Sequence, residues 1–261
     1  MFQRLLSVFI LIGICSITFS TYQIINAAVG DYTGISFDTG GNTSPQGVVA
    51  YDGFFWFVDS DDDEVYKFNL DGTYTGTHFD TAGSGADNVF DITAYNDFFW
   101  LTDFTDDEVY KYNPDGTYTG VSFDTAASGA GNVTGITAYN DFFWLIDFTD
   151  DEVYKYNPDG TYTAVYFDTN VAGVGNAGSI LAYNDFFWII DSADDFIYLF
   201  NPDGTYTGTT YDTSAVTVGI DGLAVNNDFL WIVDDREDLA HQFDPLNDLT
   251  GEFFNTTING T

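Results

Sequence analysis

Five acidic loops hold the side chains whose type and spacing could do chemistry. They occupy residues 59–64, 103–108, 147–152, 191–195 and 234–238. Ca²⁺ takes about six to eight oxygen ligands, so clustered carboxylates suit it. Turn formation is the competing interpretation, because Asp side chains hydrogen-bond their own backbone in tight turns. The candidate metal ligands are Asp59, Asp61, Asp103, Asp106, Asp147, Asp150, Asp191, Asp194 and Asp234.

Paired carboxylates also raise the possibility of a secreted polysaccharide hydrolase or lyase. Such catalysis needs acids in different environments, whereas these acids recur from unit to unit. The two histidines, His78 and His241, occupy non-equivalent positions, and we expect both at the rim or facing solvent. No pattern predicts a Ser-His-Asp site or a phosphate-binding loop. The sequence therefore favours a protein that is not an enzyme.

The charge balance excludes one class of partner. The chain has 41 acidic residues against 5 Lys and Arg, a formal charge of -36, so it offers no basic surface for nucleic acid. Hydrophobic residues make up 45% of the 261 residues, enough for a packed core. Salt or divalent cations should raise the melting temperature, because they screen or bind carboxylates that repel one another within a loop.

The first 30 residues differ from the rest. Arg4 precedes an uncharged run over residues 5–29, and small residues before Ala28 provide a cleavage site. This pattern predicts a signal peptide at 1–27 and a secreted or cell-surface protein. An uncleaved membrane anchor or helix over the same residues is the alternative. Asn-x-Ser/Thr sequons predict glycosylation at Asn42, Asn132, Asn255 and Asn259.

A sequence repeat positions the acidic loops. Consecutive tryptophans are 44, 44, 44 and 43 residues apart, at Trp56, Trp100, Trp144, Trp188 and Trp231. A fixed period of this size is typical of propellers and solenoids. In the third unit, aromatic and β-branched runs predict strands at 134–139, 142–147, 152–156 and 162–168. Residues 157–160, Asn-Pro-Asp-Gly, predict a type I turn that joins the last two strands in a hairpin.

The second strand of each unit indicates how the units assemble. Residues 142–147 place bulky apolar side chains on both faces, so this sheet must be covered on both sides. Four-stranded blades packed around an axis achieve this, whereas an open solenoid needs polar end units. We predict an all-β chain with a five-bladed β-propeller over residues 31–258, preceded by the hydrophobic segment and followed by a tail at 259–261.

Ring closure leaves one strand without an assigned place. Residues 31–39 resemble the fourth strand of a unit and precede the first complete set, so they can pair with the third strand of the last unit. Residues 249–257 also resemble a fourth strand. A sixth blade, a partial extra blade, or strand addition to another molecule would use the surplus strand.

The repeats resemble NHL-like propeller repeats and the tandem repeats of bacterial surface and secreted proteins. Trp144 followed by Asp147 at a strand end, and Asp159-Gly160 in the hairpin, carry the resemblance, with equivalents in the other units except for the hairpin of the last. The resemblance implies a propeller fold rather than an activity. Residues near the strand-end Asp are acidic here, where NHL-like repeats usually carry a basic residue.

Three functions remain open at this level. The first is a non-catalytic extracellular propeller for adhesion, ligand binding or self-assembly, with a glycan, a surface or its own copies as partner. The second is a filament subunit that uses the hydrophobic N-terminus or the surplus strand. The third is the polysaccharide hydrolase or lyase. A membrane partner enters only through residues 5–29 if they are uncleaved, and Ca²⁺ is the one cofactor that the sequence favours.

Overall fold

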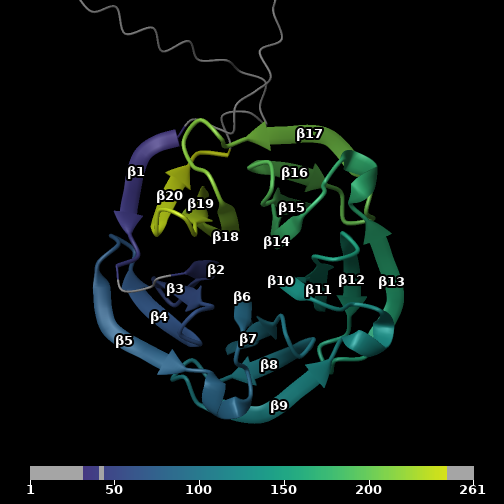
Figure 1. Cartoon of the computed structure of the whole chain (residues 1–261), viewed down its shortest axis with the longest axis horizontal. Coiled ribbons are helices and arrows are strands. Elements are labelled where there is room, and N and C mark those ends of the chain that lie inside the picture. Colours follow the sequence, from purple (N-terminus) through teal and green to yellow (C-terminus); the bar gives the residue numbers. More distant parts are fainter. Residues whose placement is uncertain (1–31, 41–43, 246–261) are drawn as a thin grey trace, which may run out of the picture.

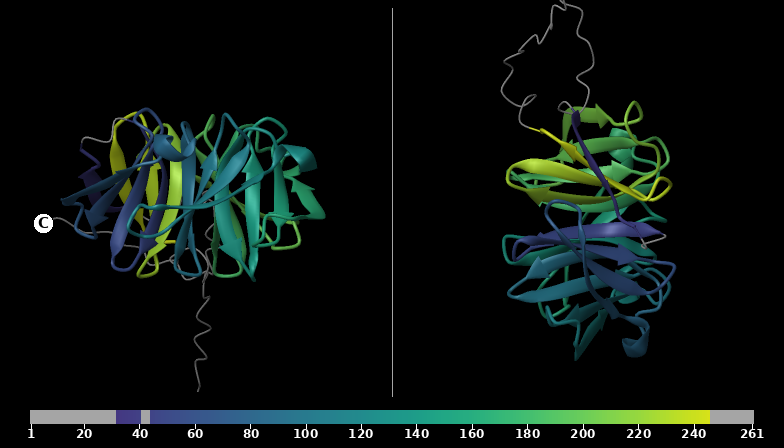
Figure 2. Two further views of the ribbon diagram at one scale, coloured as in Figure 1. Left: turned by 90° about the horizontal axis from the view of Figure 1, so that it is seen from below. Right: turned by 90° about the vertical axis from the view of Figure 1, so that its left-hand side faces the viewer.

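The computed structural model describes residues 32–40 and 44–245. These residues form five four-stranded antiparallel sheets arranged as blades around a central axis (Figure 1). Seen from the side, the inner strands run roughly along this axis (Figure 2), whereas the outer strands lie along the rim of the ring (Figure 1). The five-bladed β-propeller predicted from the sequence is thus confirmed. In the described part of the chain, no helix is long and apolar enough to cross a membrane.

Each blade runs from an inner to an outer strand. Blade one contains β2 (Pro45–Tyr51), β3 (Phe54–Asp59), β4 (Glu64–Asn69) and β5 (Tyr74–Asp80). Blade two contains β6 (Val89–Tyr95), β7 (Phe98–Asp103), β8 (Glu108–Tyr112) and β9 (Tyr118–Asp124). Blade three contains β10 (Val133–Tyr139), β11 (Phe142–Asp147), β12 (Glu152–Tyr156) and β13 (Tyr162–Asp168). Blade four contains β14 (Ala177–Tyr183), β15 (Phe186–Asp191), β16 (Phe196–Phe200) and β17 (Tyr206–Asp212). Blade five contains β18 (Ile220–Asn226), β19 (Phe229–Asp234), β20 (Leu239–Phe243) and, from the other end of the described chain, β1 (Tyr32–Asp38).

Turn chemistry sets the register of each blade. Between β6 and β7, Asn96 and Asp97 both have positive φ, as a type I′ hairpin turn requires. In the hairpin between β12 and β13, the Gly160 amide donates to the carbonyl of Asn157 at 2.9 Å, which confirms the predicted turn. Of the four strands predicted in this unit, three have the predicted bounds and the first begins one residue earlier, at Val133.

The core lies between blades, because the second strand of each blade is buried on both faces. Trp100 of β7 lies 4.7 Å, centroid to centroid, from Phe143 in the next blade. At the outer edge, Phe123 of β9 packs on Gly160 of the next blade, where a Cβ atom would lie only 2.4 Å from the Phe123 side chain. Glycine is thus required in this hairpin both for its φ of +84° and for space.

The N-terminal strand closes the ring, as the sequence predicted. β1 pairs with β20, and Phe37 packs against Gly72 in the same way as Phe123 packs against Gly160. Both the amide and the hydroxyl of Thr39 donate to the Asp238 carbonyl at 2.9 Å. The surplus strand predicted at 249–257 and the hydrophobic segment at 1–27 lie outside the described residues.

Candidate functional site

The first aspartate of each acidic loop ends the second strand of its blade and caps the turn that follows. In blade three, Asp147 Oδ1 accepts the amides of Thr149 and Asp150 at 2.7 and 3.0 Å, and Oδ2 accepts that of Gly131 at 2.8 Å. Related backbone-capping contacts occur in the other blades, at Asp59, Asp103, Asp191 and Asp234. Turn formation therefore accounts for the recurrence of this residue at the same position in all five blades.

Of the predicted metal ligands, only Asp103, Asp106 and Asp234 lie in a group of three described side chains that could share one ion. The predicted residues Asp61, Asp106, Asp150 and Asp194 are all exposed. Within the described residues, Asp87, Asp103 and Asp106 place carboxylate oxygens within 4.8 Å of one another. Asp234 forms a similar group with Glu237 and His241. Metal binding by the predicted set stays a prediction.

Of the predicted glycosylation sites, Asn132 lies within the described residues. Its amide nitrogen donates to the Phe104 carbonyl at 3.3 Å, and its side-chain oxygen accepts the Thr149 hydroxyl at 2.9 Å. Asn42, Asn255 and Asn259 lie outside the described residues.

The propeller axis breaks the repeat. The third residue of the innermost strand differs between blades and is Gly47, Asp91, Gly135, Ser179 or Gly222. Space explains the glycines. A Cβ atom on Gly47 would lie 2.4 Å from Asp91 Oδ1, and one on Gly222 would lie 2.1 Å from the Gln46 carbonyl oxygen. At this level the Asp91 carboxyl occupies the space beside Gly47, and backbone of the adjacent blade occupies the space beside Gly222.

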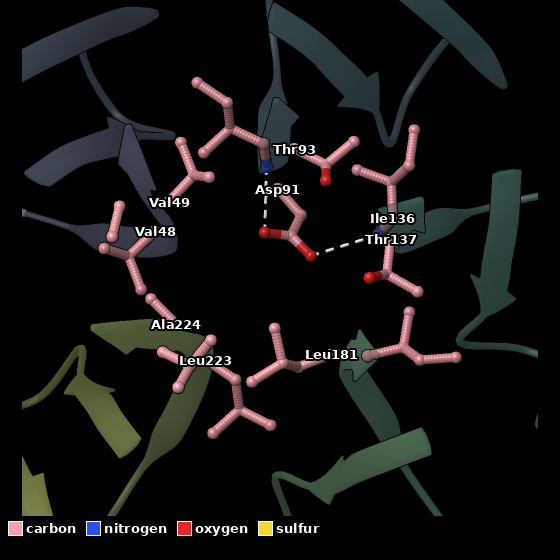
Figure 3. Close-up of a pocket in the computed structure, with 13 residues that line it drawn as sticks. Val48, Val49, Asp91, Thr93, Ile136, Thr137, Leu181, Leu223 and Ala224 are labelled. Atoms are coloured by element: carbon pink, nitrogen blue, oxygen red, sulfur yellow. Dashed lines mark hydrogen bonds between the residues drawn. The ribbon is translucent and has the colours of Figure 1, made fainter. Parts of the chain in front are cut away.

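Asp91 is 2% exposed and crosses the axis to contact two other blades. Its Oδ1 accepts the amide of Ile92 at 2.8 Å (Figure 3). Its Oδ2 accepts the amide of Ile136 and the hydroxyl of Ser179, both at 3.0 Å. Burial raises the pKa of Asp91 to about 7, although these hydrogen bonds favour the charged form. A carboxyl with such a pKa can gain or lose a proton near neutral pH.

A recess of about 90 Å³ opens beside Asp91. The innermost strands line it with aliphatic side chains, and Thr93 and Thr137 add hydroxyl groups (Figure 3). Asp91 is the only ionisable group among the described residues that line it. We call this cavity the axial recess; its aliphatic and backbone lining comes from Val48, Val49, Ala50, Ile92, Ile136, Ile180, Leu181, Leu223, Ala224 and Val225.

A second recess of about 30 Å³ is lined by the second residue of each innermost strand and by Phe148 and Ser192, which follow β11 and β15. Phe90 and Phe148 form an aromatic side, with Phe104 4.9 Å from Phe90 between ring centroids. Asp221 lines the same recess and hydrogen-bonds the Asp235 carboxyl. Burial and the charge of Asp235 raise the pKa of Asp221.

The expectation for His241 is wrong. This residue is 4% exposed and lies in β20, rather than at the rim. The strand register explains the burial, since His241 faces Ile232 of β19 and Ser36 of β1. His78 is exposed, as expected, and its Nε2 lies 3.7 Å from Glu64.

Asp91 and Ser179 were missed in the sequence, although a signal was present. The innermost strands consist mainly of small and apolar residues, so the two acids within them, Asp91 and Asp221, stand out when the five strands are aligned on the tryptophans. The acids that repeat cap turns, whereas Asp91, which interacts across the axis, occurs at its position in one blade only.

No protein-family model matches the chain, and no curated protein matches its sequence. The likeness to NHL-like repeats therefore remains a resemblance. Among solved structures, the glutaminyl cyclase of Myxococcus xanthus superposes with a TM-score of 0.65 at 13% identity, over 80% of this chain and 93% of that one. Regucalcin from Agrobacterium tumefaciens, described as a calcium-binding protein, gives 0.55 at 11%, over 83% and 95%.

Virginiamycin B lyase from Staphylococcus aureus is also similar, with a TM-score of 0.50 at 17% identity over 79% of this chain and 72% of that one. At these identities the likeness shows the fold alone. It nevertheless overturns the expectation that the chain is not an enzyme, because a cyclase and a lyase share this fold. That expectation also assumed that the blades are nearly identical, but they differ at the axis, where Asp91 occurs once.

Proposed function

We propose that the axial recess binds a compact organic cation and that Asp91 is its counter-ion and proton acceptor. The buried Asp91 carboxyl in a recess with aliphatic walls is the observation that carries the proposal. An aliphatic wall favours the apolar body of a ligand, and a desolvated carboxylate gains most from a protonated amine. Enzymes on the same fold support a catalytic role for such a site.

The charge of the whole chain supports a cationic ligand. A formal charge of -36 attracts cations toward the protein. None of the described Lys or Arg residues lines the axial recess to neutralise Asp91. An ammonium group beside Asp91 would therefore meet one carboxylate without a competing protein cation.

The chemistry available at this site is proton transfer. With a pKa of about 7, Asp91 can accept a proton from a bound molecule and return it at neutral pH. Ser179 holds the carboxyl from the opposite side, and the Ile136 amide fixes its orientation. We propose a general-base role for Asp91 on a small amine-bearing substrate.

Calorimetry with benzylamine, benzyl alcohol and benzoate tests this proposal. We expect benzylamine to bind best, with an affinity that rises as pH increases through about 7, because Asp91 must be ionised. Asp91→Asn should abolish the preference for the amine, whereas Asp115→Asn, which removes an exposed charge, should keep it. Absence of benzylamine binding, equal binding of the alcohol, or an unchanged Asp91→Asn variant would overturn the proposal.

A second proposal concerns Ca²⁺ at Asp87, Asp103 and Asp106, whose oxygens converge. Asp63 supports it, because its buried Oδ1 has no hydrogen-bond partner. Burial and the charges of Asp87 and Asp103 raise the pKa of Asp63. CaCl₂ should raise the melting temperature over that in EGTA, and a double Asp87→Asn, Asp106→Asn variant should lose the rise. A rise that survives in this variant would contradict the assignment.

We further propose that the protein is secreted and acts in adhesion or self-assembly, as the sequence suggests. Mass spectrometry of the mature N-terminus tests secretion, with a start near Ala28 as the expected result. Deletion of residues 249–261 tests strand addition, because self-association of the truncated protein would exclude it.

A further inference from the structure

Blade five departs from the other blades where its second and third strands meet. Asp234 ends β19, Glu237 lies in the following turn, and His241 lies in β20. Each offers one ligating atom, and these atoms lie within 4.8 Å of one another. Two carboxylates and an imidazole at this spacing form a set of three potential metal ligands.

His241 provides an independent sign of a missing partner. It is 4% exposed, and neither ring nitrogen has a hydrogen-bond partner. An imidazole buried in this way is costly, because its polar atoms have lost water without replacement. Tyr32 of β1 contacts the ring edge-on, with centroids 5.7 Å apart, which leaves the nitrogens unpaired.

The equivalent position in the other four blades is a tyrosine: Tyr66, Tyr110, Tyr154 or Tyr198. In blade three, the Tyr154 hydroxyl reaches Glu152 and donates to it at 2.6 Å. Blade five has Leu239 where blade three has Glu152, so it lacks this acceptor. Histidine at 241 therefore replaces a satisfied tyrosine by a group with two unused nitrogens.

The carboxylates of Asp234 and Glu237 differ in how freely they can turn toward a metal ion. Asp234 is buried, and its oxygens accept the amides of Val218, Arg236 and Glu237 and the hydroxyl of Thr217. These four hydrogen bonds use the lone pairs of the carboxylate, so coordination by Asp234 requires the Thr217 hydroxyl to rotate away. Glu237 is exposed, and its side chain can turn toward an ion without loss of packing.

We propose that Asp234, Glu237 and His241 bind one divalent transition-metal ion of the zinc class. An imidazole nitrogen favours such ions over Ca²⁺ and Mg²⁺, which prefer oxygen ligands. Three protein ligands also leave a coordination position for water or another ligand. The site adjoins the ring closure, since the neighbouring Asp238 carbonyl accepts both hydrogen bonds from Thr39. Metal binding should therefore stabilise the closing blade.

Zinc titration by calorimetry and the visible spectrum of the Co²⁺ form test the proposal on the full chain. We expect one high-affinity ion per chain, a Co²⁺ spectrum with nitrogen ligation, and a higher melting temperature with Zn²⁺. His241→Tyr restores the residue of the other blades, so it should fold and lose both the ion and the spectrum. Asp150→Asn, at the position equivalent to Glu237 in blade three, is the control and should keep both.

Excess Ca²⁺ separates this site from weak binding to surface carboxylates, because it should displace only the latter. Zinc binding that is lost to excess Ca²⁺, or equal in wild type and His241→Tyr, would overturn the proposal. So would the absence of high-affinity zinc binding in a wild-type protein whose melting curve shows a cooperative fold.

Discussion

The acidic turns and the innermost strands use aspartate in opposite ways. In the turns, an Asp at the end of the second strand recurs in all five blades, and its oxygens accept backbone amides, as Asp147 does. At the axis, Asp91 occurs once and accepts hydrogen bonds from two other blades. The recurrent acids build the scaffold, and the single one creates a distinct chemical environment.

This difference follows from geometry. The acidic turns have the same local surroundings in every blade, so the same residue caps the turn in all five. The innermost strands converge on a single axis, where side chains of different blades compete for space. A Cβ atom on Gly47 would meet Asp91, whereas one on Gly135 or Gly222 would meet backbone atoms of an adjacent blade. An aspartate at this position in all five blades is therefore sterically excluded.

Titration of Asp91 should give the largest change in the free energy of unfolding. Its pKa shift from 3.8 to about 7 means that between these pH values the folded state holds a proton that the unfolded chain has released. The free energy of unfolding should thus fall as pH rises through this window, by about 4 kcal/mol. Urea unfolding at several pH values measures it. In Asp91→Asn the fall should be smaller, and an unchanged slope would contradict the environment assigned to Asp91.

Gly222→Ala tests the space at the axis. The added Cβ would lie 2.1 Å from the Gln46 carbonyl oxygen, so backbone must move, at a cost of about 3 kcal/mol. Gly175→Ala is the matched control, because no atom lies within 4 Å of its added Cβ. Chemical denaturation of both variants compares them. Equal stability of the two would show that the axis tolerates side chains from more than one blade.

Much of the scaffold could be predicted from the sequence, because period-two patterns and turn residues are local signals. These signals predict the bounds of β11, β12 and β13 and the closure of the ring by β1. The axial site could not be, since it depends on which residues of distant blades meet. Ser179 and Asp91 are 88 residues apart and share a hydrogen bond. Burial of His241 likewise depends on β1, far away in the chain.

Asp147→Asn measures how much the aspartate that caps the acidic turn contributes to the free energy of unfolding. Asparagine keeps one acceptor oxygen, and its NH₂ group must face at least one of the backbone amides that Asp147 now accepts. A buried amide without an acceptor costs about 1–3 kcal/mol. Asp150→Asn, in the same turn but exposed, should change stability by less than about 0.5 kcal/mol. Urea titrations should separate them, and equal effects would show that charge rather than capping matters in this loop.

Lys155→Gln should change the free energy of unfolding least. It tests a contact of the third strand, which lies farther from the axis than Asp91. The Lys155 ammonium lies 3.6 Å from the centroid of Phe142, a cation–π contact, while blade five carries Gln242 at this position. Loss of the contact should cost about 0.5–1 kcal/mol. In a chain with a charge of -36, removal of a cation also increases long-range repulsion, which salt screens. Unfolding at low and at high NaCl separates the two contributions, because the contact with the ring should persist at high salt. A cost that vanishes there would show that Lys155 acts only through net charge.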